Sequence, residues 1–122
     1  MSDLSDFGRI LRKMVEQTPG VHGAVFTDWE GEPVDQYARG PVIEIQISGA
    51  QWGIVRQEVQ EALNRLRVGT LRSIYIANER AQVFVRCITT EYFVMLQASP
   101  DAHLGKTIAS LERACDELES NM

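Results

Sequence analysis

The chain has 122 residues and a formal net charge of -5, which disfavours binding to nucleic acid because phosphate groups repel a negative protein. This length holds one hydrophobic core of ordinary size, and the 44% hydrophobic content excludes a disordered protein, so we expect a single domain over residues 1–122. The sequence contains no apolar run long enough to span a membrane and no secretory signal, and we therefore expect a cytoplasmic protein that is not inserted in a membrane.

The first predicted element is an amphipathic helix that ends at Thr18-Pro19-Gly20. Its start is expected to be capped by Ser2 or Asp3. Proline disfavours helical geometry in the residue before it, and glycine tolerates a positive φ, so this tripeptide terminates the helix. Apolar residues recur at helical spacing with charged residues on the other face. The apolar set is Leu4, Phe7, Ile10, Leu11, Met14 and Val15.

Two strands joined by a tight turn are predicted next. The strands are Val21–Thr27 and Glu32–Tyr37, and the turn is Asp28–Gly31. The second strand contains Pro33, which has no N–H group to donate to a neighbour, so this strand is expected at an edge of the sheet. Within the segment that follows, Val42–Ile47 alternates between apolar and polar residues. This alternation favours an additional extended segment, with no indication of what it pairs with.

A second helix is predicted over Trp52–Leu66, with an apolar stripe that occupies about a third of its circumference. Ile54 lies almost opposite that stripe, among polar residues. Single exposed apolar residues are common and need no function, so two interpretations stay open: an ordinary surface residue, or a contact with a partner. The stripe comprises Trp52, Val55, Val59, Ala62, Leu63 and Leu66.

The last third of the chain predicts three strands in an antiparallel meander, Leu71–Ile76, Val83–Ile88 and Tyr92–Leu96. Both faces of these strands are apolar, so helices are expected on both faces of the sheet. The first of the three is expected at an edge, and soluble proteins rarely leave such a strand open. A final helix is predicted from its apolar stripe of Leu104, Ile108, Leu111, Cys115 and Leu118.

The sequence contains no motif for nucleotide binding, metal binding or hydrolysis: it lacks G-x-x-x-x-G-K-[ST], G-x-G-x-x-G, G-x-S-x-G and C-x-x-C. We therefore predict no catalytic residues, no cofactor and no metal site. A catalytic pair of Cys87 with His22 or His103 would require the fold to bring distant residues together. A buried thiol and two ordinary histidines is the simpler interpretation.

The order of elements and the residues that fill it resemble the Roadblock/dynein light-chain family, and within it bacterial MglB-like proteins. The matching motifs are Thr18–Ala24 leading to Asp28–Pro33, the central amphipathic helix, and Leu96–Gly105 with its Ser-Pro-Asp-Ala-His-Leu-Gly. Each motif is common alone, but their order and spacing are specific and cover nearly the whole chain. The resemblance implies an α/β, profilin-like α-β-β-α-β-β-β-α sandwich with a central antiparallel five-stranded sheet, two helices on one face and one on the other.

The resemblance also implies a function. In this family the third strand pairs with its own copy in a second subunit, which implies a homodimer with Arg72, Ile74 and Tyr75 at the interface and a role there for Ile54. It further implies a regulator or scaffold that has no enzymatic activity and binds a small Ras-like GTPase. Its effect on the GTPase would be activation of GTP hydrolysis, nucleotide exchange or tethering. The partner is expected on the face that carries the middle helices. The candidate partner-binding residues are Gln57, Glu58, Glu61, Asn64 and Arg65.

Two alternatives remain at this point. A small-molecule sensor of profilin-like or PAS-like outline would hold its ligand between sheet and helix, although aromatic residues belong more often to a core. A structural subunit of a motor or membrane-associated complex would share the fold and differ in its partner. For the sensor, the candidate cavity residues are Trp29, Trp52, Phe84 and Tyr92.

Overall fold

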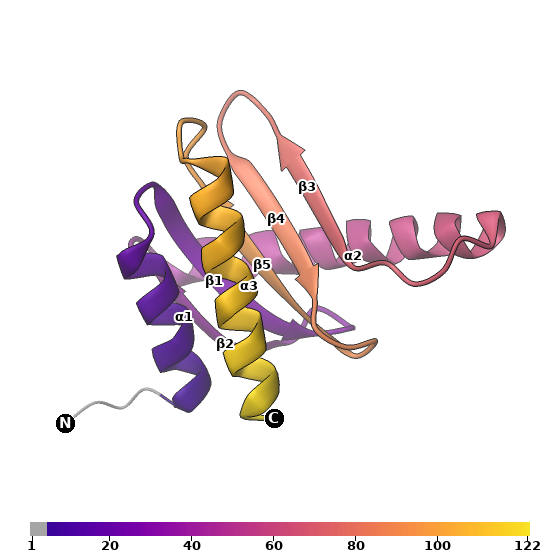
Figure 1. Ribbon diagram of the computed structural model, residues 1–122, viewed down its shortest axis with the longest axis horizontal. Helices are drawn as coiled ribbons and strands as arrows, with labels where there is room; N and C mark the ends of the chain where they lie inside the picture. Colours follow the sequence, from indigo (N-terminus) through magenta and orange to yellow (C-terminus); the bar gives the residue numbers. More distant parts are fainter. Residues whose placement is uncertain (1–4) are drawn as a thin grey trace.

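The computed structural model describes residues 5–122 and contains the helices and strands in the predicted order (Figure 1). The five strands form one sheet in the order β2-β1-β5-β4-β3, with every neighbouring pair antiparallel. The predicted five-stranded antiparallel sheet is confirmed, and so are its two edge strands, β2 and β3. The elements are α1 (Asp6–Gln17), β1 (Val21–Asp28), β2 (Pro33–Ala38), α2 (Val42–Leu66), β3 (Ser73–Ala77), β4 (Gln82–Cys87), β5 (Tyr92–Ala98) and α3 (Leu104–Ser120).

Helices cover both faces of the sheet, because the central strands are apolar on both sides. Figure 1 shows α1 and α3 in front of the sheet and α2 behind it. Successive residues of β5 point to opposite faces: Val94 and Leu96 belong to the core under α1 and α3, and Phe93 and Met95 to the core under α2. The two cores are therefore separate layers, as expected for a sandwich with two helices on one side and one on the other.

Short polar contacts fix the ends of α1. The hydroxyl of Ser5 caps its start by accepting a hydrogen bond from the Gly8 N–H at 3.0 Å. The predicted caps, Ser2 and Asp3, lie outside the described residues. At the other end, the buried hydroxyl of Thr18 donates to the Met14 carbonyl at 2.6 Å and lies 2.6 Å from the hydroxyl of Ser110 in α3. This contact joins the two helices of one face.

The segment predicted to be extended, Val42–Ile47, forms the first turns of α2, so that prediction is wrong. Two glycines let this helix approach the sheet closely. A Cβ added at Gly49 would lie 2.4 Å from Cγ1 of Val25, and one added at Gly53 would lie 3.2 Å from Cζ of Phe93. The sheet-facing surface of α2 is therefore formed partly by backbone.

Two predicted apolar stripes are rotated or shifted in the structure. In α2 the buried residues are Ile45, Gly49 and Gly53, while the stripe predicted from Trp52 to Leu66 is only half-buried and Leu66 is 69% exposed. In α3 the inward stripe starts at Thr107, whose hydroxyl donates to the His103 carbonyl at 2.8 Å. The outer positions therefore remain exposed. Of the predicted α3 stripe, Leu111, Cys115 and Leu118 are buried, and Leu104 and Ile108 are exposed.

Candidate functional site

The surface of α2 that points away from the sheet carries a line of isoleucines. Ile43, Ile47 and Ile54 are 59%, 57% and 52% exposed. Their spacings of four and seven residues place them on one side of the helix, opposite the buried residues. We call these three residues the α2 ridge. The sequence interpretation found only Ile54, because it assigned the other two to an extended segment.

Polar residues continue the same side of α2 toward its end. Gln57, Glu58, Glu61 and Arg65 are exposed, and nothing within residues 5–122 makes a hydrogen bond or an ion pair with their side chains. These side chains are thus available to a partner. Asn64 differs from them, since its Oδ1 accepts a hydrogen bond from Gln60 Nε2 at 2.9 Å at the flank of the helix.

The C-terminal turns of α2 extend beyond the sheet. The helix packs on β2, β1 and β5, and Figure 1 shows its last turns projecting past the edge strand β3. Leu63 is therefore only half-buried, and Leu66 and Val68 are exposed. We call Val59, Ala62, Leu63 and Leu66 the overhang stripe. Apolar residues on a helix face that its own sheet does not cover indicate a surface completed by another molecule.

The chain leads from the end of α2 to β3, whose outer edge is open. Among the described strands, β3 pairs only with β4, so its outer N–H and C=O groups are free of strand partners. Ile74 packs at the margin of the core under α2. Tyr75 points to the other face, where its ring lies 5.0 Å from that of Phe84, and Arg72 is exposed just before the strand. The three candidate interface residues of this strand therefore surround one open edge.

The strand register separates the residues of the possible catalytic pair. Cys87 lies beside Phe93 at one end of the sheet, whereas His22 lies between Val21 and Gly23, which pair with the opposite end of β5. His103 follows that same distant end and caps α3 through Nδ1, which accepts from the Lys106 N–H at 3.1 Å. The cysteine–histidine pair is therefore not formed.

The aromatic cavity of the sensor alternative is also not formed. Phe84 and Tyr92 pack in or against the core under α1 and α3, Trp52 packs against the core on the opposite face, and Trp29 is exposed. The sheet stands between these side chains, so they do not line a common space. No helix within residues 5–122 combines the length and apolarity needed to cross a membrane, and the same residues contain no cluster of three potential metal ligands.

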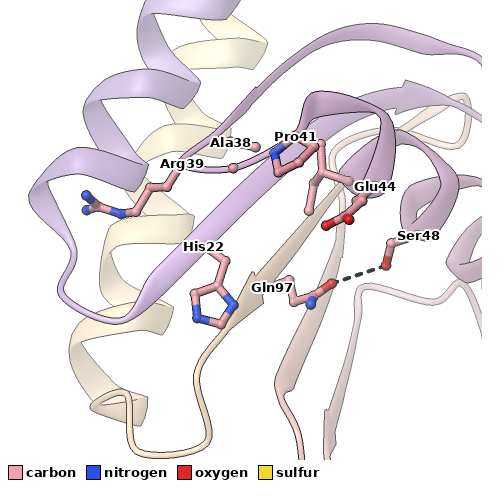
Figure 2. Close-up of a pocket in the computed structure, with 9 residues that line it drawn as sticks. His22, Ala38, Arg39, Pro41, Glu44, Ser48 and Gln97 are labelled. Carbon is pink, nitrogen blue, oxygen red and sulfur yellow. Dashed lines mark hydrogen bonds between the residues drawn. The ribbon is translucent and has the colours of Figure 1, made fainter.

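A cavity of about 590 Å³ lies between the start of α2 and the ends of β1 and β5. Figure 2 shows His22, Glu44, Ser48 and Gln97 around it, with the Ser48 hydroxyl donating to Gln97 Oε1 at 3.3 Å. The guanidinium of Arg39 points away and donates to the carbonyls of residues 21 and 15 at 2.9 and 2.7 Å. Its positive charge is thus engaged by the backbone, so this cavity has no free cation from Arg39 to hold a nucleotide phosphate.

Comparisons with known proteins identify the fold. No protein-family model and no curated protein matches the sequence. A Roadblock/LC7 domain from Streptomyces avermitilis has a TM-score of 0.85 at 15% identity, covering 98% of both chains. Myxococcus xanthus MglB has a TM-score of 0.86 at 8% identity, covering 98% of this chain and 96% of its own.

A third solved structure, MglB with a tetrameric arrangement, has a TM-score of 0.81 at 16% identity and covers 98% of this chain and 92% of its own. The three similarities extend over nearly every element described above, at identities that leave few side chains in common. They confirm the family resemblance at the level of architecture. The chain has the Roadblock/LC7 fold, in a form similar to that of MglB.

Proposed function

We propose that this protein is a homodimeric regulatory module that binds a small Ras-like GTPase and has no enzymatic activity of its own. The observation that carries the proposal is the combination of an open strand edge, an uncovered overhang stripe and an exposed apolar ridge on α2. The structural similarity to MglB supports it, since the resemblance to that group implies such a partner.

The dimer is the first step of the proposal. Pairing of β3 with its own copy would satisfy the free backbone groups of Ser73–Ala77 in a symmetric, two-fold arrangement. The same symmetry would lay the overhang stripe of each α2 against the other subunit and remove Leu66 from water. Arg72, Ile74 and Tyr75 would lie along the paired strands, with Ile54 on the adjoining helix face. The tetrameric MglB neighbour supports self-association of this fold.

The partner surface is the second step. The α2 ridge supplies apolar area, and the polar end of the same helix supplies side chains that can specify a partner. The ridge stands on the part of α2 that packs on the sheet, and the polar residues continue along the same helix beyond it. The proposed partner-binding residues are Gln57, Glu58, Glu61, Asn64 and Arg65. A regulator of this kind acts by ordering groups of the GTPase around its nucleotide, which requires no nucleotide pocket in the regulator.

Sedimentation velocity tests the dimer. The wild-type chain is expected to sediment at twice its 13.7 kDa mass. Ile74→Lys should shift it toward the monomer, because a charge at the paired edge opposes pairing. Ile108→Lys is the matched control, since Ile108 is an exposed isoleucine on the opposite face. A wild-type protein that stays monomeric at micromolar concentration would remove the dimer from the proposal.

Binding to GTPases loaded with GDP or with a non-hydrolysable GTP analogue tests the partner surface. Charge reversal by Glu61→Lys or Arg65→Glu is expected to change affinity by ~1–3 kcal/mol for a desolvated contact. Because both side chains are exposed, the unfolding free energy should change by only ~0.5 kcal/mol. Glu119→Lys on α3 is the control and should leave affinity unchanged. Unaltered affinity in both α2 variants would refute the site.

A further inference from the structure

A second cavity, of about 260 Å³, lies on the α2 side of the sheet and is lined by three segments distant in sequence. These segments are the middle of α2, the connection from α2 to β3, and the end of β4 with the turn that follows it. The side chains that line it include one cation and several hydrogen-bond donors, and no carboxylate. The lining residues are Arg56, Gln60, Asn64, Thr70, Leu71, Cys87, Thr89 and Thr90.

The guanidinium of Arg56 is the charged group of this cavity. Its Nη2 donates to the Trp29 carbonyl at 3.3 Å, and its central carbon lies 5.4 Å from the centre of the Phe93 ring. Its Nε is buried and has no hydrogen-bond partner among residues 5–122, and the same residues offer it no carboxylate within 4.0 Å. A partly buried cation with an unsatisfied donor and no counterion is energetically unfavourable.

Fixed hydrogen bonds leave further donors around this cation. The Leu71 N–H donates to Gln60 Oε1 at 2.8 Å, and Gln60 Nε2 donates to Asn64 Oδ1 at 2.9 Å. Because the Asn64 oxygen is engaged, its amide nitrogen remains free to donate. In the turn after β4, Thr89 Oγ1 accepts from the Glu91 N–H at 3.1 Å, so the Thr89 hydroxyl proton is also free. The cavity therefore offers a positive charge surrounded by donors.

We propose that this cavity binds an oxoanion, either a phosphate group or a carboxylate, with Arg56 as its principal ligand. A planar guanidinium forms paired, charge-assisted hydrogen bonds with both groups, and Arg56 is the only charged residue that lines this cavity. Asn64, Thr89 and the neighbouring threonines would bind its remaining oxygens. The site is distinct from the α2 ridge and does not depend on the proposed GTPase partner.

Cys87 lines the same cavity and can report its occupancy. Burial raises the pKa of the Cys87 thiol above its ordinary value, and the positive charges of Arg56 and Arg86 partly offset this effect. An anion beside Arg56 would cancel part of that positive charge and shield the sulfur. Since the thiolate is the reactive form, the bound protein should be alkylated more slowly by a neutral reagent such as iodoacetamide.

The test measures the alkylation rate of Cys87, resolved by peptide mass spectrometry, as phosphate or acetate replaces chloride at constant ionic strength and pH. The proposal expects a saturable decrease with at least one of the two anions. A decrease with phosphate alone identifies a phosphate site, a decrease with acetate alone identifies a carboxylate site, and both together establish the shared chemistry. No saturable decrease with either anion overturns the proposal.

Variants connect the effect to the cavity. Arg56→Gln is expected to weaken anion binding by roughly tenfold or more, because it removes the positive charge and the planar guanidinium group. Arg113→Gln, at an exposed arginine of α3, is the matched control and should retain wild-type affinity. Asn64→Asp tests the site without altering a buried group, since a negative charge at the rim should abolish protection. Wild-type protection in Arg56→Gln and Asn64→Asp would overturn the assignment.

Discussion

The two cysteines occupy different environments although both are free thiols. Cys115 lies on the inner side of α3, where burial raises the pKa of its thiol to about 12. Cys87 is only partly buried and borders a cavity that is open to solvent. The reactivities of the two thiols should differ sharply because only the thiolate is nucleophilic.

We expect iodoacetamide to modify Cys87 in the folded protein well before Cys115. At about pH 8, a thiol with a pKa near 12 is ionised in roughly one molecule in ten thousand, and the sulfur is also covered by its neighbours. Peptide mass spectrometry after timed quenching measures both rates. In urea the two cysteines should react equally. Equal rates in the native protein would contradict the packing of α3.

A cluster of hydrogen-bonded side chains on the α1–β2 surface predicts that the stability of the protein depends on pH. Tyr37 Oη and Arg12 Nε both donate to Glu16 Oε1 at 2.8 Å. The Tyr37 hydrogen bond is the main cause that holds the pKa of Glu16 below its ordinary value, followed by the hydrogen bond from Arg12. A lowered pKa in the folded state stabilises the protein above the unfolded pKa, and this contribution disappears as the pH falls through the folded value.

Tyr37→Phe should therefore return the pKa of Glu16 toward its ordinary value. The variant should be less stable than wild type at about pH 7, and the difference should shrink at an acid pH below the folded-state pKa of Glu16, where the carboxyl is protonated in both proteins. Carbon-detected NMR of the Glu16 carboxyl gives the pKa, and urea unfolding at the two pH values gives the stability. An unchanged Glu16 titration would show that the Tyr37 bond is absent in solution.

At the scale of the element, α2 explains why part of the fold was not predictable from local pattern. Isoleucines at 43, 45 and 47 alternate like those of a strand because the helix is apolar on two opposite faces: Ile45 contacts the sheet, and the others form the ridge. The sheet-facing surface also includes Gly49 and Gly53, which contribute no side chain to an apolar stripe. Their role depends on contacts with β1 and β5, which the sequence of α2 alone does not reveal.

Gly49→Ala tests this close approach. Alanine favours a helix over glycine by about 1 kcal/mol, but here its Cβ would meet the Val25 side chain at 2.4 Å. We expect a net destabilisation of ~1–3 kcal/mol, typical of overpacking. Gly40→Ala is the control, because a Cβ there meets nothing within 4 Å. Urea unfolding measures both. A more stable Gly49→Ala variant would mean that α2 lies farther from β1.

At the scale of the whole molecule, the order of the helices and strands was more predictable from the sequence than the features of the surface. Pro33 indicated an edge and the meander after α2 indicated the other, and the sheet has both edges where expected. The extension of α2 beyond the sheet was not predictable, because it depends on where the helix crosses the sheet in the tertiary fold. The Arg56 cavity was equally hidden, since it is formed by residues near 60, 70 and 88 that only the tertiary fold brings together.

The proposed dimer predicts that stability depends on protein concentration. If the overhang stripe is covered only by the second subunit, folding and association are linked, and the melting temperature should rise with concentration. Leu66→Glu should remove that dependence and lower the melting temperature. Differential scanning calorimetry over a hundredfold dilution series, about the range needed for a clear shift, provides the measurement. A concentration-independent wild type would argue that each protomer is stable alone.

The sheet order has a consequence for the growing chain. The pairing of β1 with β5 joins Val21–Asp28 to Tyr92–Ala98, so the centre of the sheet cannot close until β5 has left the ribosome. Until then the hairpins β1–β2 and β3–β4 have no strand between them. Such long-range pairing slows folding and leaves apolar strand edges open during synthesis. Release of β5 is thus the event that commits the nascent chain to its native topology.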